Sequence, residues 1–268
     1  GKNQWVVLQD RLEKELTEIL DTHEKPSFWI DRESAGLLNP KITEKYEKYK
    51  AKNIKLKSSD DNTTGILLDV HELSLGYENQ PLFSGLSFQL RASDKLHIIG
   101  RNGAGKTTLV KAIMDTVAGA KPNTLIGKGI INPSRELRVS LYEQELSGEL
   151  MHLTLFQAVE HIYYEKGVQV NEQAVRQAMS NYLFDPAADS STLVSNLSGG
   201  QKARLQLIRM LAGSPNLLIL DEPTNHLDLP SIEELENALL KYSGAVIYIS
   251  HDSYFAKNIG GNSITIGN

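Results

Sequence analysis

The sequence contains no cysteine and no long apolar segment, and both absences narrow the class of protein. Without cysteine there is no disulfide and no thiolate metal site. No stretch approaches the roughly 18 consecutive apolar residues that a membrane-spanning helix needs. The first residues, "GKNQWVVLQD", have an apolar run too short for a secretory signal peptide. With 40% hydrophobic and 23% charged residues among 268, the composition predicts an ordinary soluble globular protein of the cytoplasm.

The chain also lacks an overall excess of positive charge, since 28 Lys and Arg stand against 33 Asp and Glu, a formal net charge of −5. This balance argues against a uniformly basic nucleic-acid binder. Residues 41–57, however, hold seven Lys and two Glu in a predicted helix that begins after Asn39-Pro40. Five lysines form one stripe of that helix: Lys41, Lys45, Lys48, Lys52 and Lys55. Such a stripe beside tyrosines suits an RNA phosphate backbone, and a solvated amphipathic helix is the alternative.

The composition changes near residue 60 and divides the chain into two parts. Residues 1–60 are rich in Lys and Glu and show helical spacing of their apolar residues. After a polar stretch, the region 65–268 contains short apolar runs typical of strands, and the runs at 216–220 and 245–250 are almost continuously apolar. Strands of that kind are covered on both faces in a central parallel sheet. Because helical patterns lie between them, the sequence predicts an α/β domain over 65–268.

The stretch "GRNGAGKTT", residues 100–108, matches the phosphate-binding pattern G-x-x-x-x-G-K-[ST]. It follows the predicted strand "KLHIIG" and precedes the predicted helix "KTTLVKAIMDTV". Glycines let main-chain N–H groups approach phosphate oxygens, and the helix N-terminus adds partial positive charge. The predicted ATP-binding residues here are Gly100, Asn102, Gly103, Ala104, Gly105, Lys106, Thr107 and Thr108. Lys106 would reach the β and γ phosphates, and the Thr107 hydroxyl would bind Mg²⁺.

The acidic pair Asp221-Glu222 follows the apolar run "NLLIL". A carboxylate at the carboxyl end of a central strand is expected beside the phosphate loop. We therefore expect Asp221 to hold Mg²⁺, through water, and Glu222 to act as the general base that orients the attacking water.

At this point the sequence resembles the ATP-binding cassette (ABC) family. The stretch "LSGGQ", residues 197–201, is similar to the family's signature motif, and it lies between a phosphate loop and "LLILDEP" in the family's order. The resemblance covers residues 65–268. It implies a P-loop nucleotide-binding domain with a central, mostly parallel sheet, an antiparallel β portion and a helical subdomain at about 145–196, preceded by a helical linker.

The resemblance also implies roles for further residues. Tyr77 matches the aromatic residue that stacks on adenine, Gln144 the glutamine that senses Mg²⁺ and water, Asp228 the D-loop aspartate, and His251 the histidine that contacts the γ-phosphate. Family likeness assigns the signature turn to the ATP of a second, facing cassette. The signature residues are Ser198, Gly199, Gly200 and Gln201. A helix that begins there would offer an anion site, and one cassette alone should hydrolyse ATP slowly.

The stretch "DEPTNHLD", residues 221–228, resembles the ABC-F branch, which has no membrane domain and acts on ribosomes. This implies the C-terminal half of such a protein, with residues 1–60 as part of the interdomain linker and 65–268 as the second cassette. The cassette that faces it across ATP would be the N-terminal half of the same protein or an identical copy, and the basic helix would meet the ribosome or its RNA. The stretches "PSFWIDRES", residues 26–34, and "EKYEKYKAKNIKLK", residues 44–57, resemble the subgroup that protects ribosomes from antibiotics. Two alternatives remain: an ATPase subunit of a membrane transporter, and a regulatory module that binds ATP but barely hydrolyses it.

Overall fold

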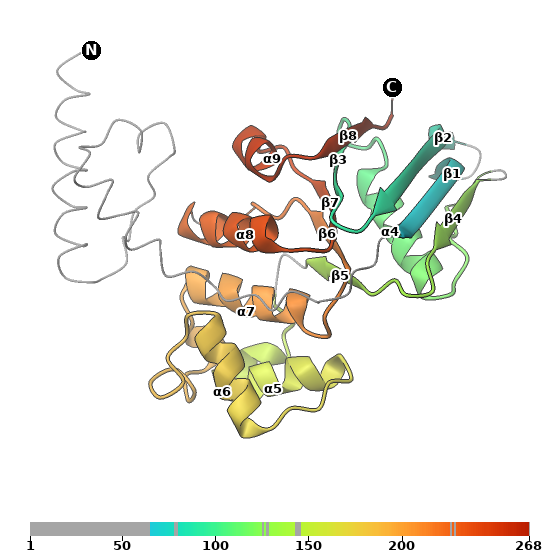
Figure 1. Cartoon of the computed structure of the whole chain (residues 1–268). Helices are drawn as coiled ribbons and strands as arrows, with labels where there is room; N and C mark the ends of the chain where they lie inside the picture. Colours follow the sequence, from blue (N-terminus) through green and yellow to red (C-terminus); the bar gives the residue numbers. More distant parts are fainter. Residues whose placement is uncertain are drawn as a thin grey trace, which may run out of the picture.

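The computed structural model describes residues 65–77, 80–124, 126, 129–142, 146–225, 227 and 229–267. These residues form two β-sheets and the helices that cover them (Figure 1). The predicted linker, residues 1–60, and its lysine stripe lie outside this range. The observed architecture confirms the predicted α/β class with one parallel and one antiparallel sheet.

The larger sheet has five strands in the order β5-β6-β7-β3-β8, and every neighbouring pair is parallel. The strands are β3 (Lys95–Ile99), β5 (Val139–Tyr142), β6 (Leu217–Asp221), β7 (Ala245–Ile249) and β8 (Asn262–Thr265). All four side chains at 217–220 and all five of β7 are buried. This explains their continuous apolar sequence, since a strand with both faces covered has no solvent-facing side for polar residues.

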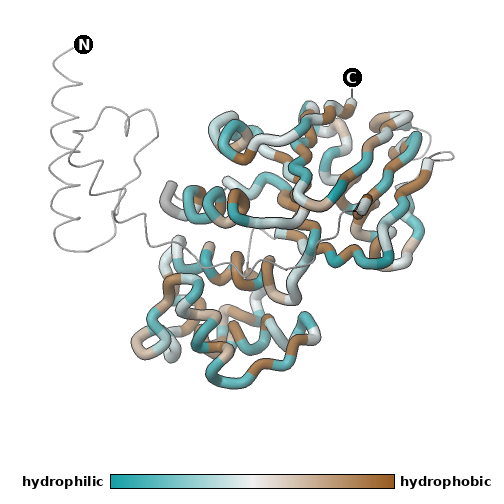
Figure 2. Tube along the Cα trace, viewed as in Figure 1, coloured by the Kyte–Doolittle hydropathy of each residue, from teal (hydrophilic) through white to brown (hydrophobic). Residues whose placement is uncertain are grey.

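The two faces of this sheet belong to two hydrophobic cores. Along β6, Leu218 and Leu220 join one core, whereas Leu217 and Ile219 join the other. This follows from the two-residue period of a strand, which sends alternate side chains to opposite faces. In Figure 2, hydrophobic and hydrophilic residues alternate along the helices and strands of the described part of the chain.

The smaller sheet is antiparallel, in the order β2-β1-β4, with β1 (Ile66–Tyr77), β2 (Gln80–Arg91) and β4 (Ile130–Pro133). Leu67, Leu68, Val70, Leu73 and Leu75 of β1 are buried in the second core, together with residues of helix α4 (Lys106–Val117). This sheet and α4 therefore cover one face of the parallel sheet (Figure 1).

The other face is covered by helices α7 (Gly199–Leu211), α8 (Leu229–Lys241) and α9 (Ser253–Ile259). Helices α5 (Leu155–Glu165) and α6 (Glu172–Asn181) pack beyond α7 (Figure 1), and the short 3-10 helices η1 (Leu150–His152) and η2 (Val194–Asn196) flank them. The first turn of α5 is fixed by a capping box between Thr154 and Gln157. No helix in the described part of the chain is long and apolar enough to cross a membrane.

Candidate active site

The candidate site forms where parallel strands end. The phosphate loop follows β3, Asp221 ends β6, and His251 follows β7, which lies between those two strands. Carboxyl ends of parallel strands share one edge of a sheet, so three segments far apart in sequence converge there.

Two glycines shape the phosphate loop. Gly103 has φ 81° and Gly105 has φ 99°, backbone conformations that are costly for other residues. Gly105 precedes the first residue of α4, so the loop leads directly into a helix N-terminus. Among the predicted binding residues, Asn102, Gly103 and Thr107 are exposed, Gly100, Lys106 and Thr108 are half-buried, and Ala104 and Gly105 are buried.

The Lys106 ammonium is held by its own loop. Its Nζ donates to the carbonyl oxygens of Gly100 at 2.8 Å and Arg101 at 3.1 Å. These bonds keep the amine over the loop. Anionic phosphate oxygens can replace the two neutral carbonyl acceptors, because an ammonium bonds an anion more strongly.

Thr107 and Asp221 meet at the predicted metal position. The Thr107 Oγ1 donates to Asp221 Oδ2 at 2.7 Å, across 114 residues of sequence. A hydroxyl and one carboxylate side by side fit Mg²⁺, which keeps several waters and binds through one or two carboxylates and substrate phosphates.

Glu222 and His251 form a second pair at the same edge. The His251 N–H donates to Glu222 Oε2 at 3.2 Å, and His251 Nε2 lies 3.3 Å from Glu222 Oε1. The Glu222 side chain is 19% exposed and that of His251 is 61% exposed. Glu222 has φ 49°, a left-handed backbone conformation, and its N–H donates to the carbonyl of Ile249 on β7. Such backbone strain at a non-glycine residue is typical of functional sites.

The signature turn is built as a helix N-cap. The Ser198 Oγ accepts from the Gln201 N–H at 3.3 Å, and the Gln201 Oε1 accepts from the Ser198 N–H at 3.0 Å. Ser198 and Gly199 are exposed, whereas Gly200 is buried. The turn is therefore held by two reciprocal hydrogen bonds and is open to solvent.

The other residues that the sequence singled out are placed differently. Tyr77, at the end of β1, is 57% exposed. Its hairpin reaches the phosphate loop, because a Cβ added at Gly105 would come within 3.1 Å of Leu82 on β2. Gln144 and Asp228 lie outside the described residues, so their roles stay predictions.

Sequence reasoning missed His97 on β3. Its ring stacks on Tyr248 of β7, with centroids 4.6 Å apart and planes 7° apart, and its Nε2 lies 3.2 Å from the Ser250 carbonyl oxygen. An imidazole in the otherwise apolar run "LHII" was the available signal.

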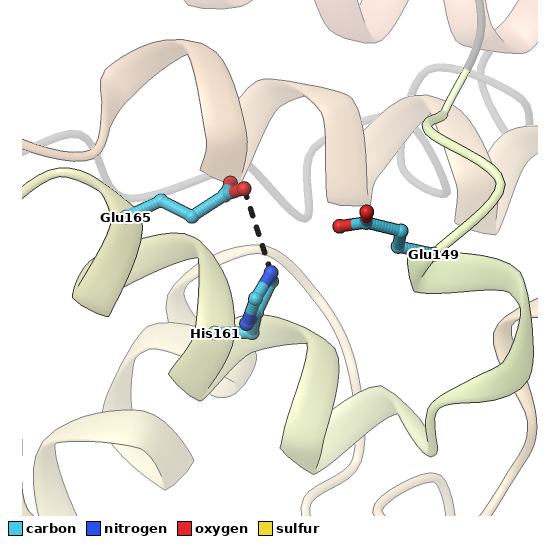
Figure 3. Close-up of side chains that lie close together, drawn as sticks. All are labelled: Glu149, His161 and Glu165. Atoms are coloured by element: carbon cyan, nitrogen blue, oxygen red, sulfur yellow. Dashed lines mark ion pairs between the residues drawn. The ribbon is translucent and has the colours of Figure 1, made fainter.

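A second group of metal-type donors lies in the helical region, on the turn before η1 and on α5 (Figure 3). His161 Nε2 is 3.4 Å from Glu165 Oε1, an i,i+4 contact, and Glu149 approaches from the other side. Both glutamates are exposed. The contact within α5 is of the kind that stabilises a helix by about 0.2–0.5 kcal/mol when the histidine is protonated.

This chain is similar to one protein-family model and to several curated proteins. Residues 83–225 match the family model described as ABC transporter. ATP-binding protein Uup of Buchnera aphidicola is 32% identical over 93% of this chain and 43% of its own. ABC transporter F family member 5 of Arabidopsis thaliana is 32% identical over 79% of this chain and 29% of its own. Ribosome protection protein VmlR of Bacillus subtilis is 31% identical over 75% of this chain and 34% of its own. The chain thus spans less than half the length of these relatives.

Among solved structures, a nucleotide-free ATP-binding cassette from an ABC transporter has a TM-score of 0.58 at 18% identity, over 75% of this chain and 88% of that one. This likeness shows the fold alone.

Proposed function

This chain belongs to the ABC transporter family, with ABC-F proteins among its relatives, and on that premise we propose that it binds ATP with Mg²⁺, hydrolyses it, and couples this cycle to the ribosome. The observation that carries the ATPase proposal is the convergence of the phosphate loop, the Thr107–Asp221 pair and the Glu222–His251 pair at one sheet edge. ABC cassettes in general bind nucleotide with a divalent metal.

Nucleotide binding is assigned to the loop between β3 and α4. Lys106 would exchange its two carbonyl acceptors for the β and γ phosphates, while N–H groups of the loop and of the start of α4 donate to the other phosphate oxygens. Thr107 and Asp221 would hold Mg²⁺, which, when bound, neutralises charge on the phosphates. The exposed Tyr77 is proposed to stack on the adenine.

Hydrolysis is assigned to Glu222 and His251. One oxygen of the Glu222 carboxylate accepts the His251 N–H, and the other faces the His251 imidazole. A carboxylate held through one oxygen, with the other facing the imidazole, can orient a water and accept its proton. His251 is the more exposed of the two side chains and would contact the γ-phosphate.

A complete site needs a second cassette in this proposal. The open signature turn at Ser198 and the N-terminus of α7 would donate to the γ-phosphate of ATP bound in the other cassette. That cassette would be the N-terminal half of a longer protein or a second copy of this chain. Asp228 and Gln144 would complete the interface and the metal shell.

Two variants test the ATPase proposal. Lys106→Ala should abolish ATP binding, because the phosphates lose their one lysine partner in the loop. Glu222→Gln should keep ATP binding and lower turnover by about 10²–10⁴-fold, the usual contribution of a general base. ATP binding is measured by equilibrium dialysis and turnover by phosphate release, with the other cassette present. Wild-type turnover in Glu222→Gln would show that the base is assigned wrongly.

The ribosome proposal rests on the relatives and on the sequence of residues 41–57. VmlR is named as a ribosome protection protein, and the lysine stripe suits RNA phosphates. The full-length parent carrying Glu222→Gln should cosediment with ribosomes in ATP, and the same protein with Lys106→Ala should not. If protection is its purpose, expression of the wild-type parent should raise the inhibitory concentration of a ribosome-targeting antibiotic. Absence of the Glu222→Gln protein from the ribosome pellet would favour the transporter ATPase or the module that binds ATP but barely hydrolyses it.

A further inference from the structure

His97 lies in β3, the strand that leads into the phosphate loop, and it contacts the neighbouring strand β7 through two different interactions. In the parallel register His97 is opposite Tyr248, and the two rings stack with centroids 4.6 Å apart and planes 7° apart. The His97 Nε2 lies 3.2 Å from the main-chain carbonyl oxygen of Ser250, one residue beyond the end of β7.

The direction of this hydrogen bond is fixed by chemistry. A carbonyl oxygen can only accept, so His97 Nε2 carries the hydrogen and donates it. The carbonyl belongs to the peptide group between Ser250 and His251. The N–H of the same peptide group donates to Glu222 Oε2 at 3.2 Å. Two hydrogen bonds thus run head to tail through one peptide group, from the His97 imidazole to the Glu222 carboxylate.

We propose that His97 is a positioning residue for Glu222: it orients the peptide group between Ser250 and His251, which in turn holds the carboxylate that faces the attacking water. This inference rests on the proposed ATPase function. Hydrogen bonds in such a chain polarise one another, so donation by His97 strengthens the bond from the His251 N–H to Glu222. The same bond links the strand before the phosphate loop to the residue assigned to γ-phosphate contact.

Tyr248 fixes the ring of His97. Tyr248 is 1% exposed, and its hydroxyl donates to the Gly260 carbonyl oxygen at 3.0 Å. Burial raises the pKa of Tyr248, so the hydroxyl stays protonated and remains a donor. The buried Tyr248 ring is held by the core around it, and stacking on it keeps the His97 imidazole turned toward Ser250.

Replacing His97 with phenylalanine keeps an aromatic ring on Tyr248 and removes the donor. The Ser250 carbonyl then loses its side-chain partner, and the peptide group can rotate. We expect kcat for ATP hydrolysis to fall about 3–10-fold, the effect of one ordinary hydrogen bond. The Kd for ATP should change less than twofold, since no phosphate-loop residue is altered. Exchange of the His251 amide hydrogen, followed by NMR, should be faster in the variant.

A matched pair of variants guards against a simple loss of folding. Gln places its amide nitrogen about where His97 Nε2 lies, whereas Asn, one methylene shorter, does not reach Ser250. Both variants lose the aromatic stack, so His97→Gln should restore slow His251 exchange and His97→Asn should not. Tyr248→Phe, which loses the bond to Gly260 but keeps the stack, should lower the melting temperature and leave kcat and His251 exchange unchanged.

These outcomes separate the inference from the proposed function. Faster His251 exchange in His97→Phe and His97→Asn, restored by Gln, supports the inference, and a parallel fall in kcat extends it to catalysis. Unchanged His251 exchange in His97→Asn overturns it, and so does an equal loss of kcat in Tyr248→Phe. If wild-type protein binds ATP without hydrolysing it, the proposed ATPase fails, while the exchange measurements still decide whether His97 positions the peptide group.

Discussion

Replacing Gly105 with alanine should destabilise the folded chain by about 2–5 kcal/mol and weaken ATP binding. Gly105 precedes α4, with φ 99° and ψ 16°, and it closes the phosphate loop. An alanine methyl at this position meets two separate obstacles, one in the backbone and one in the packing.

The backbone cost comes from the left-handed conformation, about 1–2 kcal/mol for a residue with a Cβ. The packing cost comes from β2, because the new Cβ would lie 3.1 Å from Leu82 Cβ and 3.2 Å from Phe83 Cδ1. Overpacking of this kind costs about 1–3 kcal/mol. Leu82 and Phe83 belong to the hairpin that carries Tyr77, so relief of the clash would also move the loop away from the hairpin.

Urea unfolding, followed by circular dichroism, measures the destabilisation of Gly105→Ala. The matched control is Gly148→Ala, where an added Cβ meets nothing within 4 Å and φ is not positive. That substitution should be neutral or stabilise the chain by up to about 1 kcal/mol. Equal unfolding midpoints for the two variants would refute both the strain at Gly105 and the close approach of β2.

Three further substitutions test other parts of the structure. Ser198→Ala removes the N-cap of α7 and should lower the free energy of unfolding by about 1 kcal/mol, measured by thermal unfolding. The control is the exposed Ser195, whose replacement with alanine should change that free energy by less than about 0.5 kcal/mol. Arg204→Met should lower the free energy of unfolding in urea by about 3 kcal/mol. The buried Arg204 guanidinium donates to the Leu183 carbonyl oxygen at 2.6 Å and forms an ion pair with Glu234 of α8. An unchanged free energy of unfolding would contradict this stabilising role. Thr107→Val keeps the side-chain shape but loses the hydroxyl, so ATP turnover should need more Mg²⁺ for half-maximal rate, and an unchanged Mg²⁺ titration would remove Thr107 from the metal site.

Several elements could be read from the sequence because the signal is local. The predicted helix at 106–117 is observed with the same bounds, and a helix begins at the signature turn as expected, since each has an apolar stripe and a defined start. The apolar runs at 216–220 and 245–250 correspond to β6 and β7. The bulged pairing of β1 with β2 was not predictable, because irregular register obscures the two-residue period.

The sequence by itself determined the phosphate loop, the acidic pair and the signature turn, because each is encoded in a few contiguous residues whose backbone needs are local. Only the tertiary structure decided which side chains meet. The Thr107–Asp221 bond spans 114 residues and the His97–Ser250 bond spans 153. Both hydrogen bonds depend on the strand order β6-β7-β3. That order goes with the packing of two hydrophobic cores on the two faces of the sheet. No short stretch of sequence contains that order, and so the partner of His97 could not be recognised before the fold was known.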